Sequence, residues 1–292
     1  MRKSDLDVVA AEMNSRGIRI DEEALGRALS GSEENEEGNP IIGLWALKFL
    51  KRQIKEKLVS GKVFPTWKHS ASVTGRWSVS KPCIHQFPSD HRSLVIPTDG
   101  KLFVTIDWKA ADLTQLALYS KDEKMIAICM DSDDPYADLA PYLELTRDEA
   151  KIFVLMYLYG AGRYALRKAL SALEKDKSYY RIIEGAIAGI NLYFSEFSNK
   201  LSKLMDNKAV SVGNRNIGIS APYKAVSYYA QATVAENLNS VLCQLKDNEQ
   251  FPILHYHDEV LVEVNDISEA DIVADKMAVY GQIRKSVGII WA

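Results

Sequence analysis

The spacing of hydrophobic and polar positions predicts a mainly helical chain that is interrupted by a few short strands. Helical spacing covers residues 5–29 with a break at 17–21, residues 41–60, most of 108–210, residues 222–246 and residues 267–281. Residues 62–100 show no such spacing and consist of short polar stretches interrupted by prolines. We therefore expect residues 62–100 to be irregular.

Strand-like patterns are confined to three places in the chain. Residues Leu102–Asp107 form an apolar run that ends in a carboxylate, and residues 210–218 predict a hairpin around Gly213-Asn214. Another hairpin is expected over residues 253–264, with His257-Asp258-Glu259 at its tip. Because helices and antiparallel strands are segregated rather than alternating, the pattern indicates an α+β fold.

Length and composition narrow the class of protein. With 292 residues, of which 47% are hydrophobic, the chain can bury one large domain or two subdomains. It has no apolar run of the roughly 20 residues that cross a bilayer, and its three cysteines are too few and too scattered for a disulfide framework. We expect a soluble, cytoplasmic protein. The acidic, Gly- and Pro-containing stretch Ser30–Pro40 is expected to be a linker.

The net charge of −3 and the pI of about 6.0 give no global basic footprint for nucleic acid. An enzyme that binds nucleic acid in a local groove, with the help of metal ions, remains compatible with this charge. The candidate chemistry must then come from local groups of residues.

Two carboxylates stand at strand ends that are far apart in the sequence. Asp107 ends one apolar strand, and Asp258 lies at the hairpin tip beside Glu259. If the two strands are neighbours in one sheet, their oxygen ligands could hold magnesium ions that also bind substrate phosphates. The alternative is a solvated acidic turn.

A second candidate lies on the helix expected around residues 147–160. Its residues Arg147, Lys151, Leu155 and Tyr159 are spaced by four and therefore share one helix face. Two cations one turn apart suit a triphosphate, and the apolar residues beyond them suit a base and a sugar. The alternative is a solvated basic face whose Leu and Tyr turn to the core.

A third candidate is Thr74-Gly75-Arg76, a glycine turn that presents an arginine from a hydroxyl-rich basic stretch. Such side chains predominate in contacts to phosphate and sugar.

In their order along the chain, these residues resemble the polymerase domain of family A DNA polymerases, the DNA polymerase I type. Residues 72–78, SVTGRWS, resemble the T-x-TGR-L-S segment, and residues 107–113, DWKAADL, resemble motif A, D-Y-S-x-x-E-L. The residues of the 147–160 helix resemble motif B, R-xxx-K-xxx-F/Y-xxx-Y-G. His257-Asp258-Glu259 resembles motif C, and Gln231 matches the glutamine on the helix that precedes it.

The resemblance implies which residues would bind the metal ions and the triphosphate during nucleotide addition. Asp107 and Asp258 would hold two divalent ions, Mg²⁺ or Mn²⁺, with Glu259 supporting them. Arg147 and Lys151 would grip the β- and γ-phosphates, and Lys151 would protonate the leaving pyrophosphate.

The resemblance also implies contacts to the nucleotide and to DNA. Tyr159 and Leu155 would border the nascent base pair, and Asp112 and Tyr136 would contact the incoming nucleotide. Arg76 and Gln231 would touch the minor-groove side of the primer–template end, where acceptors are common to every base pair. The other primer–template residues expected from the resemblance are Thr74, His85, Gln86 and His257.

The chain departs from the family pattern mainly at residues that shape the substrate site. Asp112 stands where the family usually has the Glu that excludes ribonucleotides, and it is one methylene shorter, so the sugar gate is expected to be looser. Leu155 replaces Phe or Tyr, and Tyr136 takes the place of a phosphate-binding His. The remaining departures are Ser227 and Tyr223, for a usual Asn and Arg, and Cys83, His85 and Gln86, for an amide-rich template-contacting set.

The implied fold is a right hand with an antiparallel-sheet palm, helical fingers and a strongly reduced thumb. The expected parts are a palm-associated segment at 1–30, a thumb remnant or linker at 31–65, palm at 66–115, fingers at 116–209 and palm at 210–292. So short a thumb predicts weak, salt-sensitive and poorly processive binding, and the length leaves no room for a proofreading domain. A partner protein could supply the missing contacts to duplex DNA.

Three functions stay open at this point. The first is primer extension with dNTPs, the second is synthesis of RNA or primers on the same fold, and the third is a catalytically silent nucleic-acid-binding protein. The short length would suit a phage or mobile-element replication protein. The tryptophans at 67, 77, 108 and 291 are expected to pack in the core rather than stack on bases.

Overall fold

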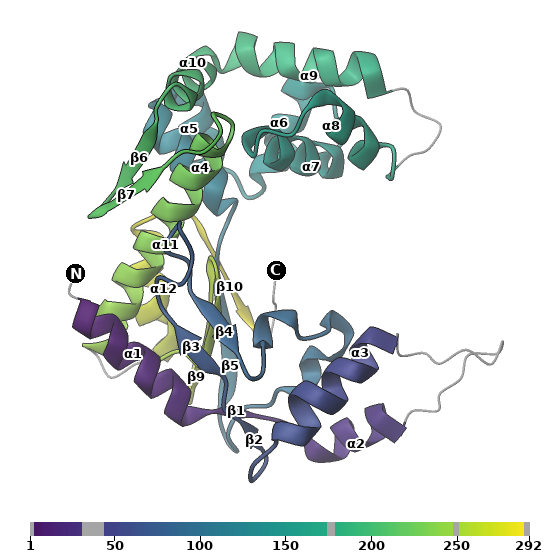
Figure 1. Cartoon of the computed structure of the whole chain (residues 1–292), viewed down its shortest axis with the longest axis vertical. Coiled ribbons are helices and arrows are strands. Elements are labelled where there is room, and N and C mark those ends of the chain that lie inside the picture. Colours follow the sequence, from purple (N-terminus) through teal and green to yellow (C-terminus); the bar gives the residue numbers. More distant parts are fainter. Residues whose placement is uncertain (1–2, 31–43, 174–178, 248–250, 289–292) are drawn as a thin grey trace, which may run out of the picture. The chain divides into compact units, whose positions relative to one another are not determined.

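The structure is a computed structural model that describes residues 3–30, 44–173, 179–247 and 251–288 (Figure 1). Residues 31–40 of the expected linker and Trp291 lie outside the described residues. The chain divides into two compact units. Unit 1 comprises residues 1–107, 238–277 and 284–292, and unit 2 comprises residues 108–237 and 278–283.

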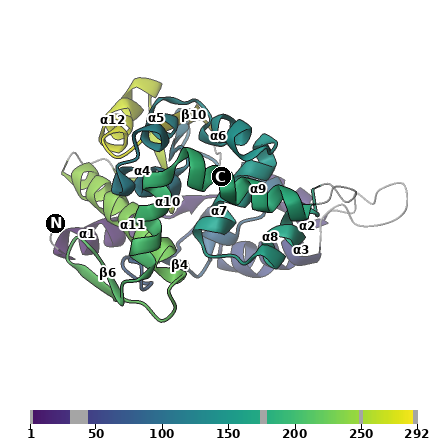
Figure 2. The same cartoon turned by 90° about the horizontal axis from the view of Figure 1, so that it is seen from above.

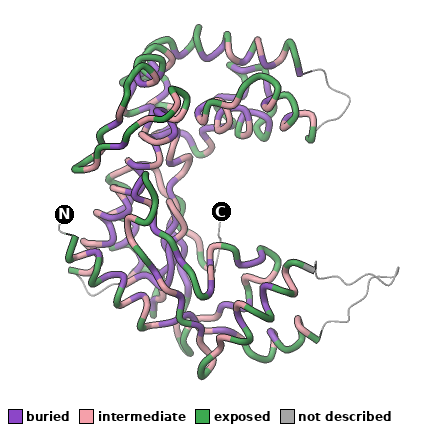
Figure 3. Tube along the Cα trace, in the orientation of Figure 1, coloured by how far each residue is buried: buried purple, intermediate pink, exposed green. Residues whose placement is uncertain are grey.

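A four-stranded sheet organises unit 1. Its strands are β5 (Leu102–Trp108), β8 (Leu254–Tyr256), β9 (Glu259–Val264) and β10 (Ile283–Val287), in the order β10-β5-β9-β8. The central pair β5–β9 is antiparallel, and most of its residues are buried, as the purple tube segments in Figure 3 show. Both strands were expected from their apolar runs, which are typical of strands covered on both faces.

Three parts of unit 1 differ from the expectation. The edge strand β10 was missed because its sequence is charged, which is common at the edge of a sheet. Residues 62–100 were expected to be irregular, but they contain the short strands β2 (Lys62–Val63), β3 (Thr66–Lys68) and β4 (Ser78–Ser80). The expected last helix is also shorter, with a 3₁₀ turn at Ile267–Ala270 followed by α12 (Asp271–Ala278).

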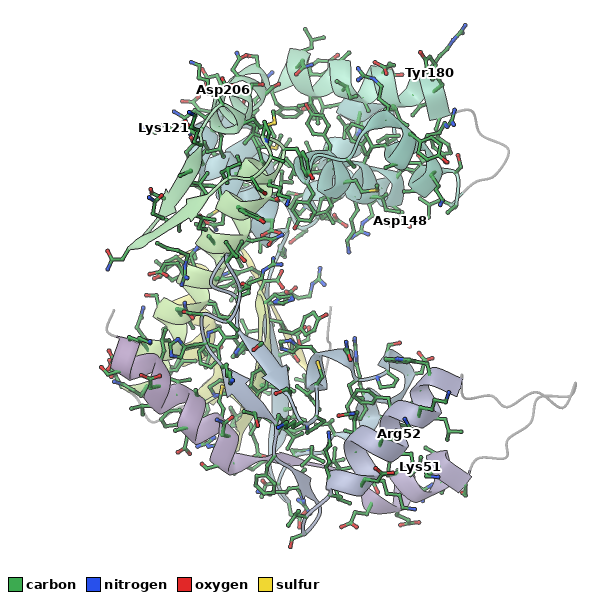
Figure 4. The ribbon with its side chains drawn as sticks, viewed as in Figure 1. Lys51, Arg52, Lys121, Asp148, Tyr180 and Asp206 are labelled. Carbon is green, nitrogen blue, oxygen red and sulfur yellow. The ribbon has the colours of Figure 1, made fainter. Side chains whose placement is uncertain are left out.

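The N-terminal part of unit 1 is helical. Its elements are α1 (Lys3–Arg16), the short strand β1 (Ile18–Arg19), α2 (Glu22–Ser30) and α3 (Leu44–Phe49). Helix α3 continues into a π-helical turn at Leu50–Ile54 and a 3₁₀ turn at Lys55–Lys57, so the expected helix over 41–60 is irregular at its basic end. Lys51 and Arg52 lie on the π-helical turn (Figure 4).

Unit 2 is mainly helical, and its helices pack around one hydrophobic core (Figure 2). The helices are α4 (Ala111–Ser120), α5 (Glu123–Asp131), α6 (Pro135–Leu143), α7 (Arg147–Leu158), α8 (Arg163–Leu170), α9 (Tyr179–Tyr193) and α10 (Ser195–Met205). Helix α11 (Lys224–Lys246) follows the hairpin of β6 (Ala209–Val212) and β7 (Arg215–Gly218), which confirms the hairpin predicted there.

Local sequence explains where the site-bearing helices begin. Helix α7 begins with a capping box, in which Thr146 accepts from the Glu149 amide while Glu149 accepts from the Thr146 amide. Helix α6 begins with Asp134, whose carboxylate accepts from the amides of Tyr136 and Ala137. These caps fix the first turns of two neighbouring helices.

Among the described residues, no helix is both long and apolar enough to span a membrane. Trp67, Trp77 and Trp108 are buried, which confirms that they pack in the core.

Candidate active site

The sheet of unit 1 brings the two predicted metal-binding segments together. In the β5–β9 pair, Asp107 lies directly opposite Glu259. Directly opposed residues in an antiparallel pair have their Cβ atoms about 4.5–5.5 Å apart and point to the same face of the sheet. Asp258 immediately precedes Glu259 in the turn between β8 and β9. The condition stated from the sequence, that the Asp107 strand and the hairpin are neighbours in one sheet, is therefore met by β5 and β9.

The three carboxylates differ in exposure. Asp107 and Asp258 are half-buried, whereas Glu259 is fully buried. The turn is tight, because the Asp258 amide donates to the Tyr256 carbonyl oxygen at 2.7 Å, and His257 adopts a left-handed φ of +57°. This geometry leaves the two aspartates accessible at the strand ends and anchors Glu259 in the core.

The donor chemistry of Asp107 and Asp258 fits a divalent cation such as Mg²⁺, which prefers oxygen ligands and is held in proteins by one or two carboxylates together with substrate phosphates. No group of three or more His, Cys, Asp or Glu side chains in metal-binding arrangement occurs within residues 3–30, 44–173, 179–247 and 251–288. A pair of carboxylates would therefore depend on a bound phosphate to complete the coordination.

The Thr74-Gly75-Arg76 segment forms a compact loop in unit 1. Gly75 adopts a φ of +83°, which glycine tolerates at little cost, and its amide donates to the Ser72 carbonyl oxygen at 3.0 Å. The Ser72 hydroxyl accepts from the Arg76 amide at 2.9 Å and lies 3.1 Å from the Thr74 hydroxyl. Thr74 is buried, so it holds the loop, and the half-buried Arg76 is the side chain that the loop presents.

The loop and the hairpin tip belong to the same part of unit 1. Burial, followed by the positive charge of nearby Arg76 and by His85, lowers the pKa of His257 to about 4. His257 is therefore neutral near pH 7. Burial also lowers the pKa of His85, whose Nε2 lies 2.9 Å from the His255 carbonyl oxygen. Gln86, next to His85, is exposed. The structure thus places Arg76, His85 and His257 close to one another.

A buried aromatic layer supports these residues. The His255 ring lies 4.9 Å from the rings of both Trp67 and Trp77, measured between centroids. Trp77 in turn donates its indole N–H to the Asn239 side-chain oxygen at 2.7 Å. The segments that carry the loop and the hairpin are therefore packed against one another and against the second half of α11.

Helix α7 of unit 2 presents the predicted phosphate-binding face. Arg147 and Lys151 are exposed, and Leu155 and Tyr159 are half-buried further along the same face. Arg147 is already held, because its guanidinium donates to Asp134 at 2.8 Å and to Asp148 at 2.9 Å; Asp148 is labelled on α7 in Figure 4. These carboxylates raise the pKa of Arg147.

Asp134 was not recognised as a site residue from the sequence. Burial raises the pKa of its carboxyl, but the Arg147 guanidinium and the first amides of α6 lower it further, so that the net shift is downward. Asp134 thus has two roles: its carboxylate caps the start of α6 and also accepts a hydrogen bond that orients Arg147. The Asp-Pro sequence was a signal for a helix start, but nothing in it pointed to Arg147.

The predicted sugar gate forms a contact within unit 2. The Tyr159 hydroxyl donates a hydrogen bond to the carboxylate of Asp112, in the first turn of α4. Gly160 follows with a φ of +77°, and a Cβ atom at this position would lie 2.4 Å from the Tyr223 Cβ. Only glycine fits there, so Tyr223 has a packing role that the sequence did not reveal.

The remaining predicted residues of unit 2 are less accessible. Tyr136 is only 7% exposed and belongs to the helical core, which leaves it little surface to offer a triphosphate. Ser227 is buried and donates to the Lys224 carbonyl oxygen at 3.1 Å. Gln231 is half-buried on α11.

Comparison with known proteins shows which family this chain resembles. The sequence profile of DNA polymerase family A matches residues 44–285. DNA polymerase I of Caldicellulosiruptor bescii is 24% identical over 258 residues, which are 74% of this chain and 29% of that protein. DNA polymerase I of Aquifex aeolicus is 24% identical over 262 residues, 81% of this chain and 46% of that protein. DNA polymerase theta of Caenorhabditis elegans is 24% identical over 263 residues, 80% of this chain and 16% of that protein. The chain thus matches less than half of the length of each relative.

A solved structure resembles the chain over nearly its whole length. It is the POL domain of Pol1 from M. smegmatis in complex with DNA primer-template and dNTP. The TM-score is 0.79 at 15% sequence identity, and the match covers 98% of this chain and 69% of the other. The fold is therefore that of a polymerase domain. The family profile, which matches well over half of the chain, makes the assignment specific: the chain belongs to DNA polymerase family A.

Proposed function

We propose that this chain is a template-directed nucleotidyltransferase that extends a primer 3′-hydroxyl with dNTPs. The observation that carries the proposal is the β5–β9 register, which sets Asp107 opposite Glu259 and beside the Asp258 turn. Two hard oxygen ligands, one near a strand end and one in the adjoining turn, in a member of DNA polymerase family A, favour phosphoryl-transfer chemistry over a silent binding role.

Asp107 and Asp258 would hold the divalent cations, with Mg²⁺ as the expected ion and Mn²⁺ as a substitute. Bound ions of this kind make the attacking hydroxyl more nucleophilic and neutralise charge on the triphosphate and the leaving group. Glu259, fully buried on the adjacent strand position, supports the site from the core. Its buried carboxylate is held in place by the sheet and needs little reorganisation during reaction.

Arg147 and Lys151 would bind the β- and γ-phosphates. Lys151 is exposed on α7, and its ammonium is the group that would pass a proton from Nζ to the pyrophosphate oxygen as it leaves. Arg147 would exchange its exposed ion pair with Asp148 for the phosphates, which is inexpensive because exposed pairs contribute only about 0–1 kcal/mol. Asp134 would keep the guanidinium oriented meanwhile.

The remaining expected residues would contact the base pair and the primer–template end. Arg76 and the neutral His257 offer donors suited to minor-groove acceptors, which are similar in every base pair. Gln231 would add a further donor, and the other expected contacts are Thr74, His85, Gln86, Leu155 and Tyr159, whereas the burial of Tyr136 disfavours the contact expected from it.

We propose further that unit 1 is mainly the palm and unit 2 mainly the fingers. The segments at 1–30, 66–115 and 210–292 would contribute to the palm, 116–209 would form the fingers, and 31–65 would be a reduced thumb or linker. The basic turns at Leu50–Ile54 and Lys55–Lys57 suit contact with a duplex backbone. Low processivity and a need for a partner protein stay predictions.

The test is primer extension on DNA and RNA templates with Mg²⁺ or Mn²⁺, at several salt concentrations. We expect dNTP-dependent extension that stops after short products and weakens as salt rises. Absence of any template-dependent product under all of these conditions would favour the silent nucleic-acid-binding alternative.

A second candidate function is ribonucleotide incorporation on the same fold. The observation that favours it is the hydrogen bond between Tyr159 and the short side chain of Asp112, which draws the carboxylate toward the tyrosine at the gate position. Extension with dNTPs and NTPs at equal concentration separates the two functions. A strong preference for NTPs would overturn the DNA assignment.

A further inference from the structure

A polar cavity of about 370 Å³ lies within unit 1, away from the carboxylates. Its walls come from the end of α1, from β1 and β2, from the segment before β5 and from the β5–β9 pair. Cavities that bind small molecules typically measure about 300–1,000 Å³, so this one has the size for a ligand comparable to a mononucleotide.

The cavity and the candidate active site lie toward opposite ends of the β5–β9 pair. Lys101, at the cavity, immediately precedes β5, whereas Asp107 lies near the other end of that strand. At about 3.3 Å per residue, the two are about 20 Å apart along the strand. Glu263 lines the cavity from the far end of β9, four residues beyond Glu259. A ligand in the cavity would therefore not overlap a nucleotide at Asp107 and Asp258.

The cavity carries a marked excess of positive charge. Four cations line it, Arg16, Arg19, Lys62 and Lys101, against the single lining carboxylate of Glu263. Like charges brought together around a cavity are costly unless an anion offsets them, and guanidinium and ammonium groups are the usual partners of phosphate.

Three of the four cations have a carboxylate partner at the rim or wall of the cavity: Arg16 pairs with Glu12 at 3.0 Å, Arg19 with Asp99 at 2.8 Å and Lys101 with Glu263 at 3.8 Å. Lys62 donates to the Arg16 carbonyl oxygen at 3.2 Å, and Arg19 donates to the Pro97 carbonyl oxygen at 3.0 Å. The partner of Arg19, Asp99, has a side chain that is 92% exposed, and the Lys101–Glu263 separation is 3.8 Å. Such solvated or long ion pairs are weak and exchange readily for a phosphate.

The rest of the wall suits the organic part of a ligand. Phe103 and Ile253 contribute apolar surface, and Ser15 and Thr98 contribute hydroxyl groups. A smaller cavity of about 200 Å³ shares Arg16, Lys101 and Glu263 and continues toward Phe251. Glu263, already near Lys101, can also accept hydrogen bonds from sugar hydroxyl groups.

We propose that this cavity is a binding site for a small phosphate ester of about mononucleotide size, separate from the polymerase site. The cations of α1, β1, β2 and the residue before β5 hold the phosphate, while Glu263 and the apolar wall hold the organic group. This proposal is independent of the proposed polymerase activity, because it uses none of the residues assigned to that activity.

The test is calorimetric titration of the whole chain, in EDTA, with AMP, adenosine and inorganic phosphate as probes. We expect AMP to bind at least tenfold more tightly than either adenosine or phosphate. Lys101→Ala and Lys62→Gln should each weaken AMP binding by about tenfold, the factor that corresponds to about 1.4 kcal/mol. Lys101→Ala also serves as the safer variant, since it removes no backbone contact.

Two matched controls make the result specific. Lys151→Ala removes the cation of the polymerase site and should leave AMP binding unchanged, as should Lys121→Ala at an exposed position (labelled in Figure 4). The proposal is overturned if AMP binds no better than adenosine or phosphate, or if Lys151→Ala weakens AMP binding while Lys101→Ala does not. It is also overturned if AMP fails to bind while a single-stranded oligodeoxynucleotide binds in a Lys101-dependent manner, since the surface would then be one for nucleic acid.

Discussion

The hairpin of unit 1 and the α7 face of unit 2 are held in different ways. Backbone pairing fixes the carboxylates, because Asp107 and Glu259 are register partners in a buried sheet. Side-chain contacts fix the α7 face, where Arg147 is paired with Asp134 and Tyr159 with Asp112. The carboxylates held by the sheet match the sequence pattern of the family. Most of the residues that depart from this pattern lie outside the sheet, where side-chain contacts rather than backbone pairing hold them in place.

This difference suggests that the chemistry is rigid and the substrate preference adjustable. A sheet residue cannot move without loss of ladder hydrogen bonds, whereas a side-chain pair on a helix can be rearranged by one substitution. Changes to the hairpin should therefore abolish activity, and changes to the α7 face should alter which nucleotide is used and how fast.

The largest effect is expected from the carboxylates. Asp107→Asn and Asp258→Asn should each lower the single-turnover extension rate by about 10³-fold or more, because an amide is a poor ligand for a hard divalent cation. Asp90→Asn, at an exposed position of unit 1, is the matched control and should leave the rate unchanged. Comparable rates for all three variants would contradict the assignment of the hairpin.

A smaller loss is expected from the exposed lysine of α7. Lys151→Ala should lower kcat by about 10²–10⁴-fold if its ammonium acts as the general acid. Lys151→Arg should restore phosphate binding, seen in KM, more fully than it restores kcat. If both variants changed KM alone, Lys151 would bind phosphate without transferring a proton.

The gate should change selectivity rather than rate. Asp112→Glu adds one methylene beside the sugar, and such a change is worth about 10–200-fold in discrimination. We expect the ratio of dNTP to NTP incorporation, measured as kcat/KM, to rise by at least tenfold. An unchanged ratio would mean that the Asp112–Tyr159 pair does not contact the sugar.

The packing of Gly160 should affect stability. Gly160→Ala places a Cβ atom 2.4 Å from the Tyr223 Cβ at a φ of +77°, and overpacking of this kind costs about 1–3 kcal/mol. Gly162→Ala is the matched control, because no atom lies within 4 Å of a Cβ built at Gly162. Equal unfolding midpoints in denaturant would show that the turn after α7 is not constrained.

The smallest effect concerns acid stability of unit 1. Burial, followed by the nearby His85 and His257, lowers the pKa of His255 well below its usual value. A histidine with a lowered folded-state pKa contributes stability above the unfolded-state pKa of about 6.5, and this stability is lost as the pH falls. His255→Leu should therefore flatten the decline in unfolding free energy below pH 6.5, as followed by urea denaturation. An unaltered slope would assign the decline to other groups.

The sequence predicted the parts of the fold whose information is local. The apolar runs of β5 and β9, the Gly213-Asn214 hairpin and the spacing of four on α7 all follow from residues close in the chain. The edge strand β10 was missed because its charges carry no strand pattern.

The sequence was enough to predict which residues belong to the candidate site. It was not enough to predict how those residues contact one another. Motif order pointed to Asp107, Asp258 and Lys151, but the Asp107–Glu259 register depends on sheet pairing across most of the chain. The pairing of Arg147 with Asp134, the packing of Gly160 against Tyr223 and the burial of Tyr136 likewise depend on tertiary contacts. The pattern of residues along the sequence does not indicate contacts between side chains that are far apart in the chain.

Asp107 and Asp258 are proposed to form a divalent-cation site that nucleotide addition requires. The most direct measurement is Mn²⁺ binding by electron paramagnetic resonance, with primer–template and a non-hydrolysable dNTP present, in the unmodified chain and in the Asp107→Asn and Asp258→Asn variants. We expect tight Mn²⁺ binding in the unmodified chain that weakens by at least tenfold in either variant, in parallel with the loss of extension. Equal Mn²⁺ affinity in all three proteins would contradict it.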